Sequence, residues 1–501
     1  MTITPSAPSR PASNAEAGAA LVLVLLFMLA VSAMGAAMMT LSRTETYASM
    51  NYRMMSQTRY GAESGVHRAV NYLLNGYALP GGAGDPLSNY NMTVSPVTFN
   101  NQPVVLSSIA GVAANYPSNA VSNAFAAAVQ GGLPVGGANV QYTASATLLS
   151  MRQILPYGTG TATVAQTWRI TGDGTLTGVR NSTVEVMAVL EREVVPAHTY
   201  AAFATNASCG ALNFSGGVAT NSYDSTAITL VNGAPVTQAN TGNVGTNGNL
   251  TETGGTVVNG SLSTPRTGVG NCANGAVDAL TSNGNAQLTG GVVQLPQAVT
   301  YLPPAPPTPQ PSESTFSITS SSTCATVGLT AANCSSTTAG VITLAVSAGP
   351  LVLGNIRVSG GATVHLTAGT YNVNSLVLSG NSNLVIDSGP VVMNVLGQDQ
   401  NTAIDLTGGT TTNTSFNPSN FQIQYAGTGG VKMSGGTSAS AMVYAPRAAV
   451  GLSGGANFYG SLLGATVNIS GGTMVHYDRH LNSTFATAGN YMLTSFTWKK
   501  Y

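Results

Sequence analysis

The strongest hydrophobic pattern in the sequence is a long apolar run near the start of the chain. Residues 17–42 contain no charged side chain and are mostly Ala, Val, Leu and Met. At 1.5 Å of rise per residue, this run is long enough as a helix to cross about 30 Å of hydrocarbon. It is also longer than the roughly 7–15 apolar residues of a secretory signal peptide. We therefore predict a retained membrane helix.

The helical pattern continues beyond the apolar run. Apolar side chains recur near helical spacing as far as Leu73, and no proline occurs between the apolar run and Pro80. We expect one continuous helix over residues 19–75, apolar on all sides in its first half and amphipathic in its second half. Gly76 is the expected stop, and the amphipathic half is expected to pack against a globular domain.

Residues 76–200 are expected to form a small β-rich unit. Apolar and polar residues alternate with period two over residues 139–153 and 166–193, which predicts strands. We interpret residues Gly172–Gly174 and Gly178–Asn181 as turns between strands. The prediction is an antiparallel sheet packed on the second half of the long helix.

A short repeat dominates the remainder of the chain. Its pattern is apolar, any residue, apolar, Ser or Thr, Gly, and then Gly or Asn. The copies begin at Leu212, Ala286, Ile356, Leu376, Ile404, Val431, Val450 and Val467. From Ser359 to Ser470 the Ser or Thr positions recur every 17 to 28 residues. This spacing is typical of one turn of a repetitive β structure with variable loops.

The repeat predicts a parallel β-helix, also called a β-solenoid. The two apolar residues of each copy would point inward, and the residue between them would point outward. Gly would turn the corner because it tolerates positive φ. We expect a first block over residues 201–300 and a second over residues 341–482. The overall class is thus α+β, with a long helix, a small antiparallel sheet and a parallel β-helix.

Two segments do not fit the repeat. Residues 301–340 open with a Pro-rich stretch and contain two cysteines, and we expect a stiff, solvated linker or excursion between the blocks. Residues 483–501 are expected to be a C-terminal tail.

The composition narrows the range of functions. Only 6% of the 501 residues are charged, the net charge is zero, 43% are hydrophobic and 59 are Gly. Disordered chains combine low hydrophobicity with high net charge, so repetitive β structure explains this composition better. No cluster of Lys and Arg is present, which argues against a nucleic-acid partner.

The four cysteines are predicted to form disulfides. They occur as no CxxC pair and have no nearby His at metal-ligand spacing, so no metal site is expected. All lie beyond the apolar run, where an exported region would be oxidised. The short separation favours Cys324 with Cys334, which leaves Cys209 with Cys272. The alternative is four unpaired cysteines.

The N-terminal segments resemble a known family. GAALVLVLL from Gly18, TETYASMNYR over residues 44–53 and YGAESGVHRAVNYLL over residues 60–74 are similar to the N-terminal domain of PilX-type minor pilins. The resemblance covers about residues 16–75. It implies that residues 1–18 are a leader cleaved after Gly18, which leaves Ala19 as the mature N-terminus. Residues 201–300 and 460–481 resemble the Gly/Ser-rich β-helical surface domain found behind such N-termini.

The resemblance also implies partners and a location. The chain would cross the inner membrane once and then enter a pilus at the cell surface, with pilin or pseudopilin subunits as partners. The β-helix would be periplasmic or extracellular. Surface glycans and other cells are candidate ligands for its hydroxyl- and amide-rich face.

Only one short stretch concentrates catalytic residue types. His476 and Asp478 would share one face of a strand, where they would form a metal or acid–base pair or, as we favour, a polar cap on the last coil. Asp405 and Lys432 are expected to be neighbours on adjacent coils, as an exposed pair. Residues 201–501 contain 15 charged residues and no paired carboxylates.

The sequence therefore predicts a structural and adhesive protein of a type IV pilus, without a cofactor and without enzymatic activity. Two alternatives remain. One is a membrane-tethered β-helical enzyme that acts on polysaccharides, and the other is a plain surface protein with a single membrane anchor.

Overall fold

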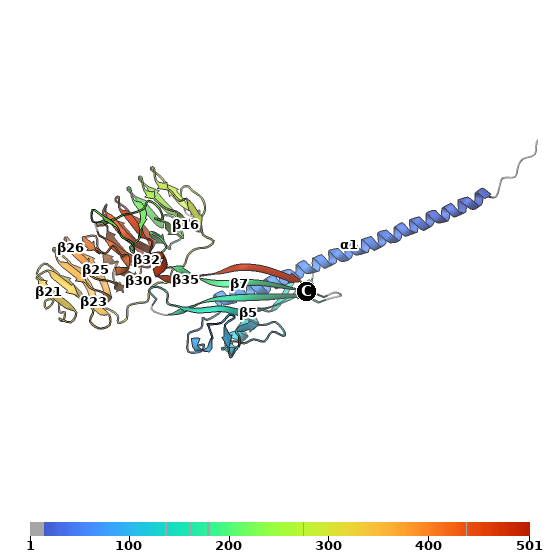
Figure 1. Cartoon of the computed structure of the whole chain (residues 1–501), viewed down its shortest axis with the longest axis horizontal. Coiled ribbons are helices and arrows are strands. Elements are labelled where there is room, and N and C mark those ends of the chain that lie inside the picture. The colour runs from blue at the N-terminus through green and yellow to red at the C-terminus, as the bar shows by residue number, and fades with distance from the viewer. Residues whose placement is uncertain are drawn as a thin grey trace, which may run out of the picture.

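A long N-terminal apolar helix is followed by a mostly β structure (Figure 1). The computed structural model describes residues 15–500, apart from residues 136–137, 160–161, 178–180, 274 and 437. Helix α1 (Ala15–Asn75) has 61 residues and ends where predicted, since the Gly76 amide still donates to the Tyr72 carbonyl. The predicted leader, residues 1–18, lies largely outside the described residues. Two short α-helices follow, α2 (Asn119–Ala128) and α3 (Leu481–Thr484). Two 3₁₀ turns are also present, η1 (Leu87–Asn89) and η2 (Pro418–Asn420).

The second half of α1 packs on an antiparallel sheet, as the sequence predicted. Ala62, Val66, Ala69 and Leu73 of α1 are buried in a core shared with the sheet. The strands, in sheet order, are β3 (Val105–Ser107), β5 (Ala138–Ile154), β6 (Thr163–Leu176), β7 (Ser182–Pro196) and β35 (Ala486–Lys500), with β4 (Gly131–Val135) paired to β5. A separate hairpin pairs β1 (Thr98–Phe99) with β2 (Gln102–Pro103).

The predicted turn at residues 172–174 is wrong. Gly172 and Gly174 lie inside strand β6, on the face that α1 covers. A Cβ atom on Gly174 would lie 2.0 Å from the Thr58 carbonyl oxygen, and one on Gly172 would lie 2.3 Å from that of Ala62. These glycines therefore allow the helix backbone to approach the sheet closely, which is a recognised use of Gly within strands.

The predicted C-terminal tail is also wrong. Strand β35 pairs antiparallel with β7 from Ala486↔Pro196 to Lys500↔Val184. The last residues of the chain thus return to the sheet beside the long helix, while the intervening residues form a separate body (Figure 1). Sequence periodicity missed this strand because its partner lies some 300 residues earlier in the chain.

Residues 202–478 form what we call the parallel stack. Its main sheet has 20 strands whose described pairings are all parallel. A second sheet has the order β21–β22–β24–β26–β29 and is parallel except for the antiparallel pair β21–β22, and β11 and β12 form a separate antiparallel hairpin. In chain order the strands up to the Pro-rich stretch are β8 (Ala202–Ala204), β9 (Leu212–Ser215), β10 (Ala219–Tyr223), β11 (Leu230–Val231), β12 (Ala234–Pro235), β13 (Val244–Thr246), β14 (Leu250–Thr253), β15 (Val257–Val258), β16 (Leu262–Thr264), β17 (Leu280–Ser282), β18 (Gln287–Leu288) and β19 (Val292–Gln294).

Those after it are β20 (Thr315–Ile318), β21 (Cys334–Thr338), β22 (Val341–Leu344), β23 (Leu351–Val358), β24 (Thr363–Leu366), β25 (Gly369–Leu378), β26 (Ser382–Ile386), β27 (Val391–Val395), β28 (Thr402–Asp405), β29 (Gly409–Thr412), β30 (Phe421–Tyr425), β31 (Gly430–Ser434), β32 (Ser440–Ser453), β33 (Asn457–Ile469) and β34 (Met474–Asp478). Strands β33 and β34 pair with β8, β9 and β10. We call residues 201–300 the early block and residues 341–482 the late block. The end of the late block therefore joins the start of the early block in one continuous stack.

The repeats stack on one another in register. Their first apolar residues pair in the order Ile356, Leu376, Ile404, Val431, Val450, Val467 and Leu212. These residues are buried, whereas the next residue of each copy is exposed or half-buried, as predicted. The copy at residues 286–291 does not belong to this row. Its Leu288 pairs with Val258 on another side of the stack, and Leu250 and Leu280 occupy the row instead.

The Pro-rich stretch, residues 301–314, packs against the stack and is not the solvated linker that was predicted. We call this segment the strap. Pro304, Pro307 and Pro311 are buried. Side chains of the stack bind its backbone: the Tyr444 hydroxyl donates to the Leu302 carbonyl at 2.7 Å, and Asn372 Nδ2 donates to the Pro309 carbonyl at 2.9 Å. The strap thus connects the end of the early block to β20 by running along the side of the late block.

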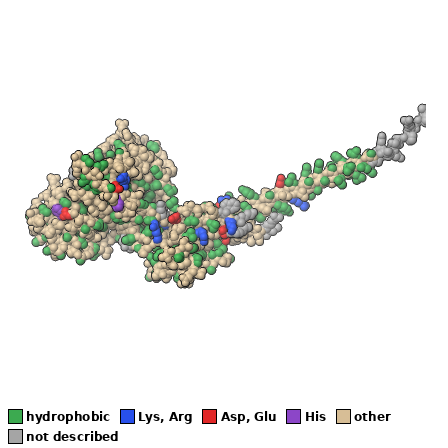
Figure 2. All heavy atoms as spheres, in the orientation of Figure 1, with side chains coloured by type: hydrophobic (Ala, Val, Ile, Leu, Met, Phe, Trp, Pro, Cys, Tyr) green, Lys and Arg blue, Asp and Glu red, His purple; other side chains and the backbone are tan. Residues whose placement is uncertain are grey.

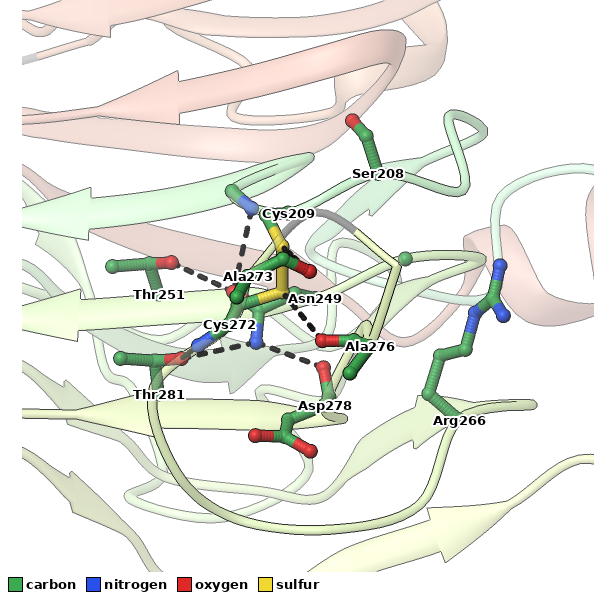
Figure 3. Close-up of a disulfide and its surroundings, with 12 residues drawn as sticks. Ser208, Cys209, Asn249, Thr251, Arg266, Cys272, Ala273, Ala276, Asp278 and Thr281 are labelled. Atoms are coloured by element: carbon green, nitrogen blue, oxygen red, sulfur yellow. Dashed lines mark hydrogen bonds between the residues drawn. A yellow bond between two sulfur atoms is a disulfide. The ribbon is translucent and has the colours of Figure 1, made fainter.

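Two disulfides are present, Cys209–Cys272 and Cys324–Cys334. Figure 3 shows the first beside Asn249, whose side chain links three successive passes of the chain. Asn249 Nδ2 donates to the Asp278 carbonyl and to Thr281 Oγ1, and Asn249 Oδ1 accepts from the Gly210 amide. This disulfide therefore ties a surface loop to the early block.

We expect the two disulfides to differ in their contribution to stability. Cys209 and Cys272 are 63 residues apart and Cys324 and Cys334 are 10 apart. In the chain-entropy model the longer loop restricts the unfolded chain more, by about 1.5 kcal/mol. Replacing the first pair with Ser should thus lower the free energy of unfolding by about that much more than replacing the second, as measured by urea unfolding. Equal losses would contradict this expectation.

Candidate functional site

The first candidate is the N-terminal half of α1. It is the one helix among the described residues that is long and apolar enough to cross a membrane, with a mean hydropathy of 2.6 in its most apolar window and no burial there. Figure 2 shows hydrophobic side chains along the projecting rod, with the first charged ones well down its length. Exposing so many large apolar side chains to water is unfavourable, so this half needs a lipid or protein environment.

The predicted processing position lies on this helix. Gly18 and Ala19 both have helical backbone within α1, and the apolar residues after them are exposed. The predicted cleavage position therefore lies near the N-terminal end of α1, and it stays a prediction.

The second candidate is the stretch around His476, on strand β34. His476 Nδ1 meets Asn221 Oδ1 on β10, and its Nε2 lies 2.9 Å from Asn457 Oδ1 on β33. The ring also stacks on Tyr459 with 4.6 Å between centroids. Burial lowers the pKa of His476 to about 4, so the ring is neutral near pH 7. A neutral ring donates at one nitrogen and accepts at the other, which requires one of the two amides to present its NH₂ group.

Asp478 also links strand β34 to the segment after β10. It is buried, and its Oδ1 accepts from the backbone amides of Ser225 and His480 at 3.0 and 3.1 Å. Burial raises the pKa of this carboxyl. No group of three His, Cys, Asp or Glu side chains suited to a metal occurs among the described residues. The contacts of His476 and Asp478 therefore connect the two blocks of the stack.

Asp405 and Lys432 are neighbours in register on adjacent passes, as predicted. Asp405 Oδ1 accepts from the amide and the hydroxyl of Thr407, at 3.1 and 2.6 Å. These local bonds organise the turn after β28. In this position the carboxylate acts as a turn residue rather than as one member of an acid–base pair.

A third candidate, which the sequence did not indicate, is a groove of about 650 Å³ between the stack and the antiparallel sheet. Its floor is the outer face of β25, β27 and β30, and its walls are the strap, the β5–β6 connection and the start of β35. The lining residues are Leu155, Pro156, Tyr157, Gly158, Thr159, Ala305, Pro306, Pro307, Thr308, Thr370, Val392, Asn394, Gln424, Thr484, Phe485 and Ala486. No local sequence signal could reveal it, because it forms where segments far apart in the sequence meet.

Beside this groove, buried side chains connect the β5–β6 connection to the stack. Tyr157 Oη donates to Gln422 Oε1 at 2.9 Å, and the Tyr157 ring packs edge-on against His198, Tyr444 and Phe485. His198 Nδ1 lies 3.1 Å from Ser461 Oγ, and burial lowers the pKa of His198 to about 3. These contacts dock the antiparallel sheet onto the stack and shape one wall of the groove.

Comparisons with known proteins add little to this picture. Residues 331–484, which include the late block, match a family described as "Domain of unknown function (DUF7305)". No curated protein matches the chain. A crystal structure of the competence-associated pilin ComZ from Thermus thermophilus is similar over 89% of this chain and 98% of that chain, with 15% identity and a TM-score of 0.26. At that score the likeness carries no inference about fold or function.

Proposed function

We propose that this chain is a pilin-like, membrane-anchored subunit that displays a parallel β-helix at the cell surface. Its role would be structural and adhesive rather than catalytic. The observation that carries the proposal is the division of α1, whose first half is bare and apolar while its second half is buried against an antiparallel sheet. A helix of this kind can sit in a bilayer and then pack against other helices in a filament without refolding of the sheet domain.

Three further features support the proposal. The N-terminal motifs resemble PilX-type minor pilins, and their Gly18–Ala19 junction lies near the N-terminal end of the apolar helix α1. The parallel pairing and the in-register apolar row are the arrangement expected of a β-helix. The two disulfides suit an oxidising location outside the cytoplasm.

The proposal is tested by locating the protein. The full chain would be expressed in a bacterium that has a prepilin peptidase and a pilus machine, and the cells would be sheared. We expect the protein in the sheared filament fraction and immunogold label along filaments. A Gly18→Asn variant should remain in the inner membrane. Recovery of the unaltered protein from the inner membrane alone would overturn the proposal.

A further inference from the structure

We propose that the groove between the strap and the late block binds a neutral oligosaccharide. This inference rests on the proposed function, because it names the ligand class of a displayed surface domain. The groove has the volume of a small-ligand site, for which about 300–1,000 Å³ is usual. Residues of β25, β27 and β30 line it together with residues 305–308 of the strap.

The floor of the groove presents amides in a row. Asn372, Asn394 and Gln424 are in register on successive strands, about 5 Å apart, and the last two line the groove. Asn372 is fully buried, its Nδ2 donates to the strap, and its Oδ1 accepts from Asn394 Nδ2 at 3.1 Å. That bond orients the Asn394 amide, and its Oδ1 accepts no hydrogen bond within the described structure. A ligand hydroxyl is a suitable donor for this oxygen.

The walls combine hydroxyls with apolar rings. Thr308 and Thr370 supply hydroxyl groups, and Pro306, Pro307 and Phe485 supply apolar surface. A sugar has the same two kinds of surface, with hydroxyls around its rim and CH groups on its faces. Sites that bury a few placed polar groups among apolar side chains are the usual form of small-ligand pockets.

The charge of the lining sets the charge of the ligand. Every described lining residue is uncharged. An acidic or basic ligand would lose hydration in the groove without gaining a counter-charge, which is unfavourable. A neutral saccharide loses less hydration and regains hydrogen bonds from the amides and hydroxyls.

The backbone of the floor argues against a peptide bound as an added strand. Strand β27 already pairs on one side with β25 and on the other with β30. Peptides that join a sheet need a free edge for main-chain hydrogen bonds. The donors and acceptors offered here belong to side chains, which suits a ligand rich in hydroxyls.

The test uses the detergent-solubilised full chain with chitotriose, cellotriose and maltotriose as neutral probes, tri-galacturonate as an anionic probe and the peptide Gly-Asn-Thr-Gly. Binding would be followed by saturation-transfer NMR and calorimetry. We expect at least one neutral trisaccharide to bind and the anionic probe not to bind. Asn394→Leu should weaken binding about tenfold through the lost amide, and Ala305→Trp should abolish binding by filling the groove.

Matched variants control for loss of fold. Asn383→Leu makes the same change on another side of the stack, and Gln310→Trp adds the same ring to the strap outside the groove lining; both should bind like the unaltered chain. Failure of all three neutral probes, binding of the peptide alone, or equal binding by Ala305→Trp would overturn the inference. The proposed function is tested separately, by identifying the first residue of the mature protein and by looking for the protein in the sheared filament fraction. A failure of sugar binding can therefore be told apart from a failure of the proposed function.

Discussion

Replacing Gly174 with Val is expected to detach helix α1 from the antiparallel sheet. The Cβ atom would lie 2.0 Å from the Thr58 carbonyl oxygen and 2.6 Å from the Ala62 amide nitrogen. Both are backbone atoms of a helix, so no rotamer change relieves the overlap. Overpacking of a well-filled core usually costs 1–3 kcal/mol, and a backbone clash exceeds this range. We expect a loss of about 3 kcal/mol or more in the free energy of unfolding.

Hydrogen exchange of the full chain in detergent would measure this effect. Amides of α1 between residues 55 and 75 should lose protection in Gly174→Val, while amides of the parallel stack should not change. Thr175→Val provides the matched control, because Thr175 lies one residue along the same strand on the opposite face. Normal protection of α1 in Gly174→Val would show that the helix does not need this close approach.

Replacing Glu252 with Gln is expected to stabilise the early block at alkaline pH. Glu252 points into the stack from β14, between Phe214 and Ser282 on the adjacent passes. It is fully buried, and neither carboxylate oxygen has a hydrogen-bond partner in the described structure. Thr256 Oγ1 is likewise buried without a partner. Desolvation raises the pKa of the Glu252 carboxyl from 4.5 to about 7.

The direction of the pH dependence follows from this shift. Between pH 4.5 and pH 7 the folded chain holds a proton on Glu252 that the unfolded chain has lost, so stability falls as the pH rises through this window. At 1.4 kcal/mol per unit, the cost at pH 8 is about 3 kcal/mol. Glu252→Gln should recover about that amount at pH 8 and change little at pH 4.

The variant must be compared with the unaltered chain at each pH. His198 and His476 have lowered pKa values and therefore destabilise the fold as the pH falls below about 6.5. The difference between Glu252→Gln and the unaltered chain removes this shared contribution. Protection of β14 and β17 amides at pH 5 and pH 8 is the appropriate measurement. A difference that does not change with pH would contradict the assignment.

Local patterns in the sequence predicted the parts of the fold that local physics determines. The apolar run and the amphipathic stretch defined α1 because helical spacing repeats every few residues. The repeats predicted which residues point into the stack, and Ile356, Leu376 and Val450 lie in one buried row. Each copy carries both its inward residues and its turn, so a short window contains the information.

The errors arose where distant segments meet. Strand β35 has no strong alternation of its own, and it becomes a strand because β7 offers an edge. Gly172 and Gly174 were interpreted as a turn because glycine has that use in most loops, whereas here it permits contact between the helix and the sheet. Composition suggested that the Pro-rich stretch is solvated, but the Tyr444 and Asn372 side chains bind it to the stack.

Some candidate sites could be recognised in the sequence, and one could not. The His476 stretch was singled out from local sequence, and the Gly18–Ala19 junction stays a prediction from the family resemblance. Local sequence gave no sign of the groove, because the Pro-rich strap, the β5–β6 connection and three strands of the late block must first come together.

Mass spectrometry of the mature N-terminus tests the central claim most directly. The protein would be purified from cells that have a prepilin peptidase, and its first residue would be identified. The account predicts a chain that starts at Ala19, because cleavage after Gly18 leaves the bare apolar half of α1 at the very N-terminus, ready to pack with other helices. A chain that keeps Met1 and the leader, or that starts within the parallel stack, would contradict it.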